Sequence, residues 1–175
     1  MSTRLILGLV SSACYGVDTR LRRELAEPAA ARGWRLAITL TPTATRWLSA
    51  NGELDRLAEL TDLPVRSEPR LPSEPKPYRT PDAFVFAPAS ANSVAKLALG
   101  IADNQALTAL MEAVGAQGIP VVVRPQADPA QRGHPAWRRH LVTLREAGVY
   151  LDDGAPEDSW ESSLDVVGSL VGGIG

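Results

Sequence analysis

The chain has 175 residues, with 18 lysines and arginines against 20 aspartates and glutamates, a formal net charge of −2. This balance argues against a protein whose main partner is nucleic acid. Hydrophobic residues make up 45 % of the chain and charged residues 22 %, which is typical of a folded globular protein and not of a disordered one. We therefore expect residues 1–175 to form a single domain with a sizeable core.

The sequence also argues against several kinds of site and location. No apolar run approaches the roughly 20 residues of a membrane-spanning helix, and the first ten residues lack the pattern of a signal peptide. We therefore expect a cytoplasmic protein with no membrane partner. The single cysteine, Cys14, excludes an intrachain disulfide. The two histidines, His134 and His140, do not fall on one helix face, so we expect no metal site.

Apolar runs and amphipathic stretches alternate along the chain. Apolar runs predict strands at Arg4–Val10, Trp34–Leu40, Pro64–Val65, Asp82–Ala87, Ile119–Val123 and Val149–Leu151. Helical spacing predicts helices at Val17–Arg32, Ala44–Leu48, Leu54–Leu60, Val94–Leu99, Ala106–Ala116, Pro135–Ala147 and Ser159–Val171. Pro28 predicts a kink or an early end in the first helix. The alternation predicts an α/β architecture, a mainly parallel sheet with helices on both faces.

Three loops of small polar residues follow predicted strands: Ser11–Ser12, Thr41–Thr43 and Pro88–Ser93. In a parallel sheet, ligands bind in the crevice beyond the carboxyl ends of the strands. Hydroxyl groups and the free N–H groups of helix N-termini suit a phosphate or another anion. The simpler alternative is that these residues only cap helices and form the tight turns that the fold requires.

Proline is concentrated in one segment, because six of the 14 prolines fall within Pro64–Pro81. Proline lacks an N–H donor and fixes its backbone, so this segment forms neither a regular helix nor a central strand. We expect either an exposed, stiff surface connection or an arm that faces the substrate or bridges subunits.

The most specific segment is Ala87–Asn104, which contains Pro-Ala-Ser-Ala-Asn-Ser and ends in Gly-Ile-Ala-Asp-Asn. It closely resembles the Pro-Ala-Ser-Ala-Asn-Thr motif and its continuation in the homo-oligomeric flavin-containing cysteine decarboxylases. Leu7–Ser12 and Thr41–Trp47 are similar to the first strand and the second loop of that family, and the likeness spans about Leu5 to Leu151. The family includes phosphopantothenoylcysteine decarboxylase and the enzymes that decarboxylate the C-terminal cysteine of lantibiotic precursor peptides.

The resemblance implies a Rossmann-like, flavodoxin-type sheet, FMN as the cofactor, and a trimer with the flavin between subunits, which can assemble further into a dodecamer. Its site residues carry over as follows: Ser11, Ser12, Thr41 and Thr43 would hold the FMN phosphate, Ala89 and Ser90 would lie beside the flavin ring, and Asp103 would support the packing on the flavin side. Asn92 is the catalytic candidate, because its amide can donate to a substrate carboxylate without carrying a charge. The alternative for Asn92 is a helix cap.

Two segments depart from the family's pattern. The family has a histidine base about a dozen residues before the Pro-Ala-Ser-Ala-Asn motif, whereas here Pro72–Arg79 contains none, and Glu74 or Tyr78 stands nearest. In the motif that closes over the substrate, Asp128 replaces an asparagine and Arg132 replaces a tryptophan. We assign both to substrate binding. Arg132 either compensates for the charge of Asp128 or pairs with it at i, i+4.

The resemblance implies the oxidative decarboxylation of a cysteine in a peptide or a small thiol. Phosphopantothenoylcysteine is disfavoured as the substrate, because that enzyme carries a downstream cysteine and nothing after Cys14 is a cysteine. The altered segments leave a second hypothesis open, an FMN-binding homologue without decarboxylase activity that acts as a partner or regulatory subunit. A third is flavin prenyltransferase, which has the same fold and to which the Ser11–Gly16 loop is faintly similar.

Overall fold

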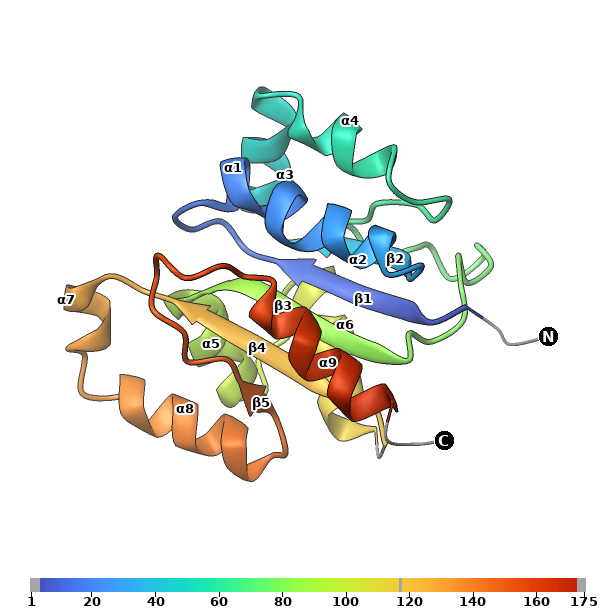
Figure 1. The fold of residues 1–175 in the computed structure, drawn as a ribbon. Coiled ribbons are helices and arrows are strands. Elements are labelled where there is room, and N and C mark those ends of the chain that lie inside the picture. Colours follow the sequence, from blue (N-terminus) through green and yellow to red (C-terminus); the bar gives the residue numbers. More distant parts are fainter. Residues whose placement is uncertain (1–3, 117, 173–175) are drawn as a thin grey trace.

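The fold is a five-stranded, all-parallel β-sheet with helices on both faces (Figure 1). The structure, a computed structural model, describes residues 4–116 and 118–172. The strands are β1 (Ile6–Ser11), β2 (Arg35–Leu40), β3 (Ala83–Ser90), β4 (Val121–Gln126) and β5 (Tyr150–Leu151). Their order across the sheet, β2-β1-β3-β4-β5, is that of a flavodoxin-like, Rossmann-type α/β fold. The predicted fold class is confirmed.

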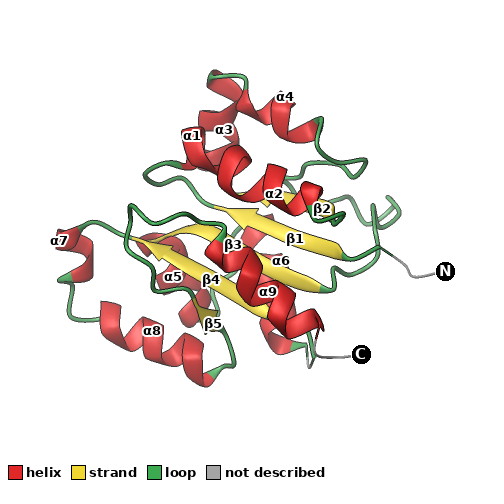
Figure 2. Cartoon of the chain, viewed as in Figure 1, coloured by secondary structure: helices red, strands yellow, loops and turns green. Residues whose placement is uncertain are grey.

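The helices connect successive strands and cover the sheet (Figure 2). They are α1 (Val17–Leu21), a π-helical stretch η1 (Arg22–Ala26), α2 (Glu27–Ala31), α3 (Pro42–Ala50), α4 (Glu53–Ala58), α5 (Ala91–Ala98), α6 (Gln105–Gly115), α7 (Pro129–Arg132), α8 (Trp137–Glu146) and α9 (Ser162–Gly172). None of the helices in the described ranges is long and apolar enough to cross a membrane.

Alternate residues of the strands feed two separate cores. On one face, Leu7 and Leu9 of β1 pack with the α1–α2 segment and with α9 through Leu164. On the other face, Phe86 of β3 packs with α5 and α6 through residues such as Leu107. Two-sided burial explains why the strands read as nearly continuous apolar runs.

A close contact on the second face requires glycine at position 8. A Cβ atom at Gly8 would lie 2.3 Å from the ring of Phe84, which belongs to the neighbouring strand. The aromatic ring therefore lies across the β1 backbone, and any larger residue at position 8 would displace it.

Two local predictions need correction. Of the two alternatives at Pro28, a kink or an early end, the early end is wrong, because the helix continues to Ala31. The π-helical stretch, which ends at Ala26, changes the hydrogen-bond register ahead of the missing N–H. The short strand at Pro64–Val65 is also wrong. A single parallel bridge joins Arg66 to Thr39 instead, since the flanking prolines cannot donate to a longer ladder.

The end of β3 also differs from the sequence prediction. Pro88–Ser93 was expected to form a loop, but β3 runs to Ser90 and α5 begins at Ala91. The pairing of β3 with β4 shifts register between Phe86 and Ala89. Strand and helix therefore meet without an intervening loop, which places the first turn of α5 directly at the edge of the sheet.

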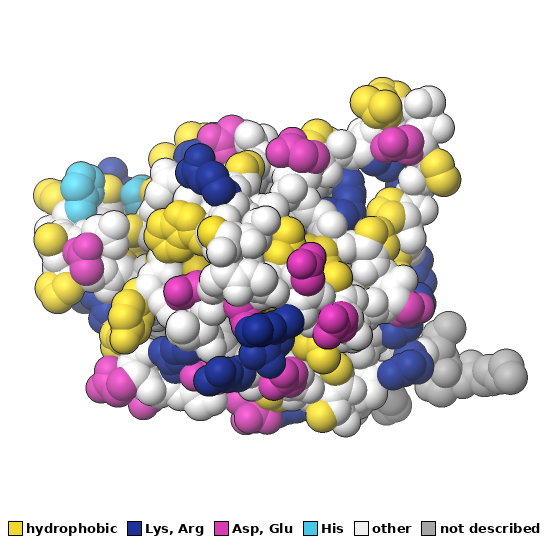
Figure 3. Space-filling view, turned by 90° about the horizontal axis from the view of Figure 1, so that it is seen from above, with side chains coloured by type: hydrophobic (Ala, Val, Ile, Leu, Met, Phe, Trp, Pro, Cys, Tyr) yellow, Lys and Arg dark blue, Asp and Glu magenta, His cyan; other side chains and the backbone are white. Residues whose placement is uncertain are grey.

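Charges of both signs are dispersed over the surface. Figure 3 shows Lys and Arg side chains interspersed with Asp and Glu on the face seen from above. Charged side chains also pair with one another in the structure, as in the contact between Arg35 and Asp62 at 2.7 Å. This face therefore offers no continuous field of one sign to a highly charged polymer.

Candidate functional site

The carboxyl ends of β1, β2 and β3 bring the three small-residue segments together at one edge of the sheet. The Thr41 N–H donates to the carbonyl of Ser11 at 3.0 Å, and the Ser12 N–H donates to the carbonyl of Pro88 at 3.0 Å. The loops that were separate in sequence are thus hydrogen-bonded neighbours. We call this edge, formed by residues 11–16, 41–43 and 89–92, the carboxyl edge.

The two buried serines of the carboxyl edge hold its backbone together. The Ser11 hydroxyl donates to the carbonyl of Ala87 at 2.7 Å. The Ser12 hydroxyl donates to the carbonyl of Pro88 at 2.9 Å and accepts from the Ser90 N–H at 2.7 Å. A hydroxyl has one hydrogen to donate, and both serines direct theirs at protein carbonyls. In this arrangement they fix the loops and leave direct donation to an anion to other groups.

Those other groups are the N–H donors of two helix N-termini. The Thr41 hydroxyl caps α3 by accepting from the Ala44 N–H at 3.4 Å, and the Ser90 hydroxyl caps α5 by accepting from the Ser93 N–H at 3.3 Å. The first-turn N–H groups that remain, including those of Thr43 and Asn92, have no acceptor within their own helices. They also carry the positive end of each helix dipole. This set of donors fits a phosphate dianion.

Asn92 lies at the second position of α5, and its side chain is exposed. The helix-cap interpretation of Asn92 is wrong, because Ser90 is the N-cap. The carboxamide is therefore available at the carboxyl edge, next to the buried Ala89 at the end of β3. It can donate a hydrogen bond to a carboxylate.

Asp103 lies beyond the opposite end of α5, which at eight residues is about 12 Å long. Its carboxylate accepts from Lys96 Nζ at 2.5 Å and from Asn104 Nδ2 at 3.2 Å. The hydrogen bond from Lys96 lowers the pKa of Asp103. The structure thus places Asp103 where it ties α5 to the start of α6.

Asp128 lies directly before α7 and Arg132 is its last residue; α7 follows β4 at the carboxyl end of the sheet (Figure 1). Asp128 caps α7, since its carboxylate accepts from the Gln131 N–H at 2.8 Å. Arg132 donates from Nε to the carbonyl of Ala127 at 2.9 Å. The predicted i, i+4 pair is not formed among the described contacts, because each side chain is engaged with the local backbone. Both residues are exposed.

The proline-rich segment is an exposed connection over most of its length. Glu74, one of the two nearest substitutes for the family histidine, accepts from the Leu71 N–H at 2.8 Å. The other, Tyr78, packs against a small cluster that includes Ile6 and Leu63. The segment lines one side of a cavity of about 610 Å³, and α6 lines the other side. The cavity lies on the sheet face opposite to α9.

Cys14, in the loop after β1, is half-buried. Burial raises the pKa of the Cys14 thiol to about 12, although a hydrogen bond to Ser12 acts in the opposite direction. The thiol therefore stays protonated at neutral pH and is a poor nucleophile. Among residues 4–116 and 118–172, no group of three or more metal-ligating side chains is brought together.

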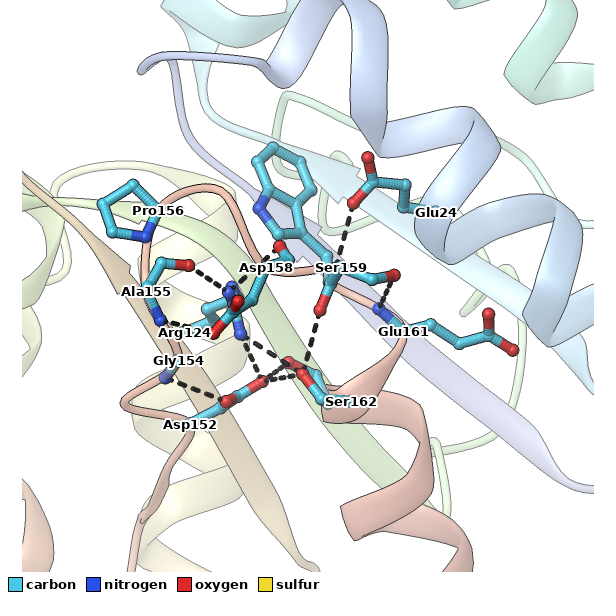
Figure 4. Close-up of polar contacts among 12 residues, drawn as sticks. Glu24, Arg124, Asp152, Gly154, Ala155, Pro156, Asp158, Ser159, Glu161 and Ser162 are labelled. Atoms are coloured by element: carbon cyan, nitrogen blue, oxygen red, sulfur yellow. Dashed lines mark hydrogen bonds and ion pairs between the residues drawn. The ribbon is translucent and has the colours of Figure 1, made fainter.

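Sequence reasoning missed a buried polar cluster at the end of β4 (Figure 4). The Arg124 side chain is 1 % exposed and pairs with Asp152 at 2.9 Å. Burial raises the pKa of Asp152, but hydrogen bonds from Ser163 and Ser162 and the charge of Arg124 outweigh it and lower the pKa. The available signal was an arginine directly after three valines in a predicted strand, because a buried charge requires a partner.

Comparisons with known proteins identify the family of the chain. The flavoprotein family model matches residues 2–167. Among curated proteins, the chain is 30 % identical over 118 residues to the coenzyme A biosynthesis bifunctional protein CoaBC of Bacillus subtilis (strain 168), covering 66 % of this chain and 28 % of that protein. It is 38 % identical over 73 residues to a probable phosphopantothenoylcysteine decarboxylase of Arabidopsis thaliana, covering 42 % of this chain and 35 % of that one. The chain thus spans about a third or less of the length of these relatives.

Solved structures match over nearly the whole chain. The FMN-dependent cysteine decarboxylase TvaF from thioviridamide biosynthesis is 27 % identical, with a TM-score of 0.77 over 97 % of this chain and 99 % of that one. The cypemycin decarboxylase CypD has the same fold at 16 % identity, with a TM-score of 0.71 over 95 % of this chain and 92 % of that one. The fold, the carboxyl edge and the family match lead to one conclusion: the chain belongs to the flavoprotein family.

Proposed function

We propose that this chain binds FMN at the carboxyl edge and oxidatively decarboxylates a cysteine at the C-terminus of a peptide, or in a small thiol of the same type. The observation that carries the proposal is the junction of β3 and α5. There, Ser90 caps the helix and leaves the Asn92 carboxamide exposed beside the first-turn N–H donors. The likeness to TvaF, an FMN-dependent cysteine decarboxylase, over nearly the whole of both chains supports it.

In this proposal the backbone binds the phosphate and the hydroxyls organise the backbone. The N–H groups of residues 13–16, of Thr43 and of the first turn of α5 donate to the phosphate. Ser11, Ser12 and Thr41 hold these segments in place through the hydrogen bonds described above. Ala89 and Ser90 lie beside the flavin ring, and Asp103 supports α5 from its far end.

Bound FMN would accept a hydride equivalent from the cysteine side chain, so that the thioaldehyde formed on the substrate can lose its carboxylate as carbon dioxide. The protein's own contribution is orientation. The Asn92 amide donates to the substrate carboxylate and orients it for departure. A neutral donor suits this role, because it holds the carboxylate without stabilising it as strongly as a buried cation would.

No general base is assigned within the proline-rich segment, because Glu74 and Tyr78 are engaged in local contacts. A free thiol with a pKa of about 8.5 is already a few per cent thiolate at neutral pH. We therefore expect turnover to rise with pH up to about 8.5, following the thiolate fraction of the substrate. A free thiol substrate also fits a reducing compartment such as the cytoplasm.

We also propose that the chain works as a trimer or as a dodecamer built from trimers. The open cavity between the proline-rich segment and α6 supports this, because it exposes part of the β2 side of the sheet that a neighbouring copy could cover. Sedimentation velocity of the purified protein should give the mass of three or twelve chains. A monomer with bound FMN would contradict this part of the proposal.

The activity is tested with a peptide that ends in cysteine, incubated with FMN-loaded protein and followed by mass spectrometry. The expected product has lost carbon dioxide and two hydrogens. Two matched peptides serve as controls, one ending in serine and one with the C-terminal carboxylate amidated, and neither should react. Bound FMN without turnover on several cysteine-ended peptides would contradict the proposed decarboxylase activity. It would favour the second candidate, an FMN-binding partner protein without that activity, which the missing family histidine and Asp128 suggest.

A further inference from the structure

Arg124 holds a loop of the C-terminal region onto the carboxyl end of the sheet. Besides pairing with Asp152, its guanidinium donates to the carbonyl of Ala155 at 2.8 Å and to that of Asp158 at 3.3 Å. The fit is tight, because a Cβ atom at Gly154 would lie 2.6 Å from Arg124 Nη1. We call residues 152–160 the anchored loop (Figure 4).

The anchored loop is joined on its other side to α1. Arg20 donates to the carbonyls of Pro156 and Asp158, both at 2.6 Å. The backbone N–H of Trp160 donates to the Glu24 carboxylate at 2.9 Å, and Glu24 also pairs with Arg20. The Arg20 guanidinium lies over the Trp160 ring at 4.6 Å from its centroid. Two arginines on separate elements, Arg124 and Arg20, therefore grip the same loop.

The anchored loop also reaches the Ser12–Gly16 loop. Gly16 has a φ of 85°, and a Cβ atom there would lie 2.9 Å from Arg20 Cδ and 3.2 Å from the Trp160 ring. Trp160 is fully buried. The left-handed backbone at the end of the Ser12–Gly16 loop is thus seated against the indole that the anchored loop supplies. Among the described residues, these contacts join the anchored loop to the Ser12–Gly16 segment of the carboxyl edge.

The polar cluster around Arg124 carries an energetic cost, because it buries polar groups. Arg124 Nε and Trp160 Nε1 are buried without a hydrogen-bond partner in the described part of the chain. A fully apolar contact of the same volume would hold α9 against β4 without burying a charge. The polar cluster instead fixes the backbone conformation of the anchored loop, because each hydrogen bond to a backbone carbonyl is directional.

We propose that Arg124 is a positioning residue for the FMN phosphate, acting through the anchored loop and Trp160 on the conformation of the Ser12–Gly16 loop. The inference rests on the proposed FMN binding. It predicts that FMN and riboflavin binding respond differently to the loss of Arg124. Loss of Arg124 weakens the grip on the phosphate, which the Ser12–Gly16 loop contacts, and spares the flavin ring, which lies beside Ala89 and Ser90.

The test compares FMN with riboflavin, which has the same ring and no phosphate. Dissociation constants of the full-length protein are measured by quenching of flavin fluorescence, below the unfolding midpoint of each variant. Arg124→Met removes the anchor, and Arg20→Gln removes the grip from α1 without leaving Asp152 unpaired. Arg145→Gln is the matched control, because it breaks the exposed pair with Asp153 in the same loop.

Arg124→Met and Arg20→Gln should each weaken FMN binding by roughly tenfold or more, comparable to the loss of a charge-assisted hydrogen bond, and change riboflavin binding less than about twofold. Arg145→Gln should change neither. An equal loss for FMN and riboflavin, or unchanged FMN binding in both variants, overturns the inference. If Arg124→Met does not fold, Arg20→Gln alone decides. A wild-type protein that binds no FMN refutes the proposed function itself.

Discussion

The two halves of the carboxyl end of this sheet are built differently. The phosphate half, at Ser11–Gly16, Thr41–Thr43 and Ser90–Asn92, is held by buried hydroxyls and backbone hydrogen bonds that cross between strands. The substrate half, at Ala127–Arg132, is largely exposed and bonded mainly within itself. The difference shows that the two halves tolerate change unequally. The first depends on backbone geometry and resembles the decarboxylases closely, whereas the second depends on individual side chains and has diverged from them.

The largest stability effect should come from the support of the phosphate half. Arg124→Met leaves Asp152 buried opposite an apolar side chain, so we expect a loss of about 3–5 kcal/mol in the free energy of unfolding. Urea unfolding followed by circular dichroism measures it. Arg145→Gln, which removes an exposed pair, should cost less than about 1 kcal/mol. Equal losses in the two variants would show that the buried cluster contributes no more to the free energy of unfolding than an exposed ion pair.

The two halves meet at Ser90 and Asn92, where neighbouring substitutions should have opposite signatures. Asn92→Ala should lower kcat by roughly 100-fold, because the substrate carboxylate is no longer held in the orientation for departure, with FMN affinity little changed. Ser90→Ala removes the cap of α5 and should cost about 1 kcal/mol of stability and weaken FMN binding. Turnover and flavin titration on both variants provide the test. Loss of FMN by Asn92→Ala would show that the Asn92 side chain binds FMN and not the substrate carboxylate.

Asp152 gives the cluster a pH dependence whose sign follows from its lowered pKa. A carboxylate with a folded-state pKa below its unfolded value of about 3.9 contributes full stability above that value, and the contribution is lost as pH falls through the folded pKa. Asp152→Asn should therefore be less stable than the wild type at pH 7, and the gap should narrow near pH 3. A gap that widens toward acid would contradict the assigned charge state.

The smallest effect should come from restoring the family's residue in the substrate half. Asp128→Asn keeps the cap on α7, because asparagine is an equally good N-cap, and it removes a negative charge near the substrate carboxylate. Since the site is exposed and screened, we expect KM to fall only a few-fold, with the change diminishing at high salt. An unchanged KM at low salt would remove α7 from the substrate site.

Much of the fold was predictable from the sequence, because each strand and helix has its own period of apolar residues. The predicted strand before Pro88 and the caps near Thr41 and Ser90 depend on residues a few positions apart. The Arg124 cluster could not be predicted in this way, since Asp152 and Ser162 lie 28 and 38 residues further along the chain. The role of Asp128 was within reach of local pattern, since Asp128 and Gln131 form a capping box at the start of α7; the predicted pair with Arg132 overlooked that local partner.

The most direct test of the account combines flavin content and turnover in one sample. The purified protein, given FMN and freed of excess, should show the visible absorbance of a flavin at about one FMN per chain. The same sample should convert a cysteine-ended peptide to a product lighter by carbon dioxide and two hydrogens. A colourless protein that takes up no added FMN would contradict the claim that the phosphate half is a working cofactor site.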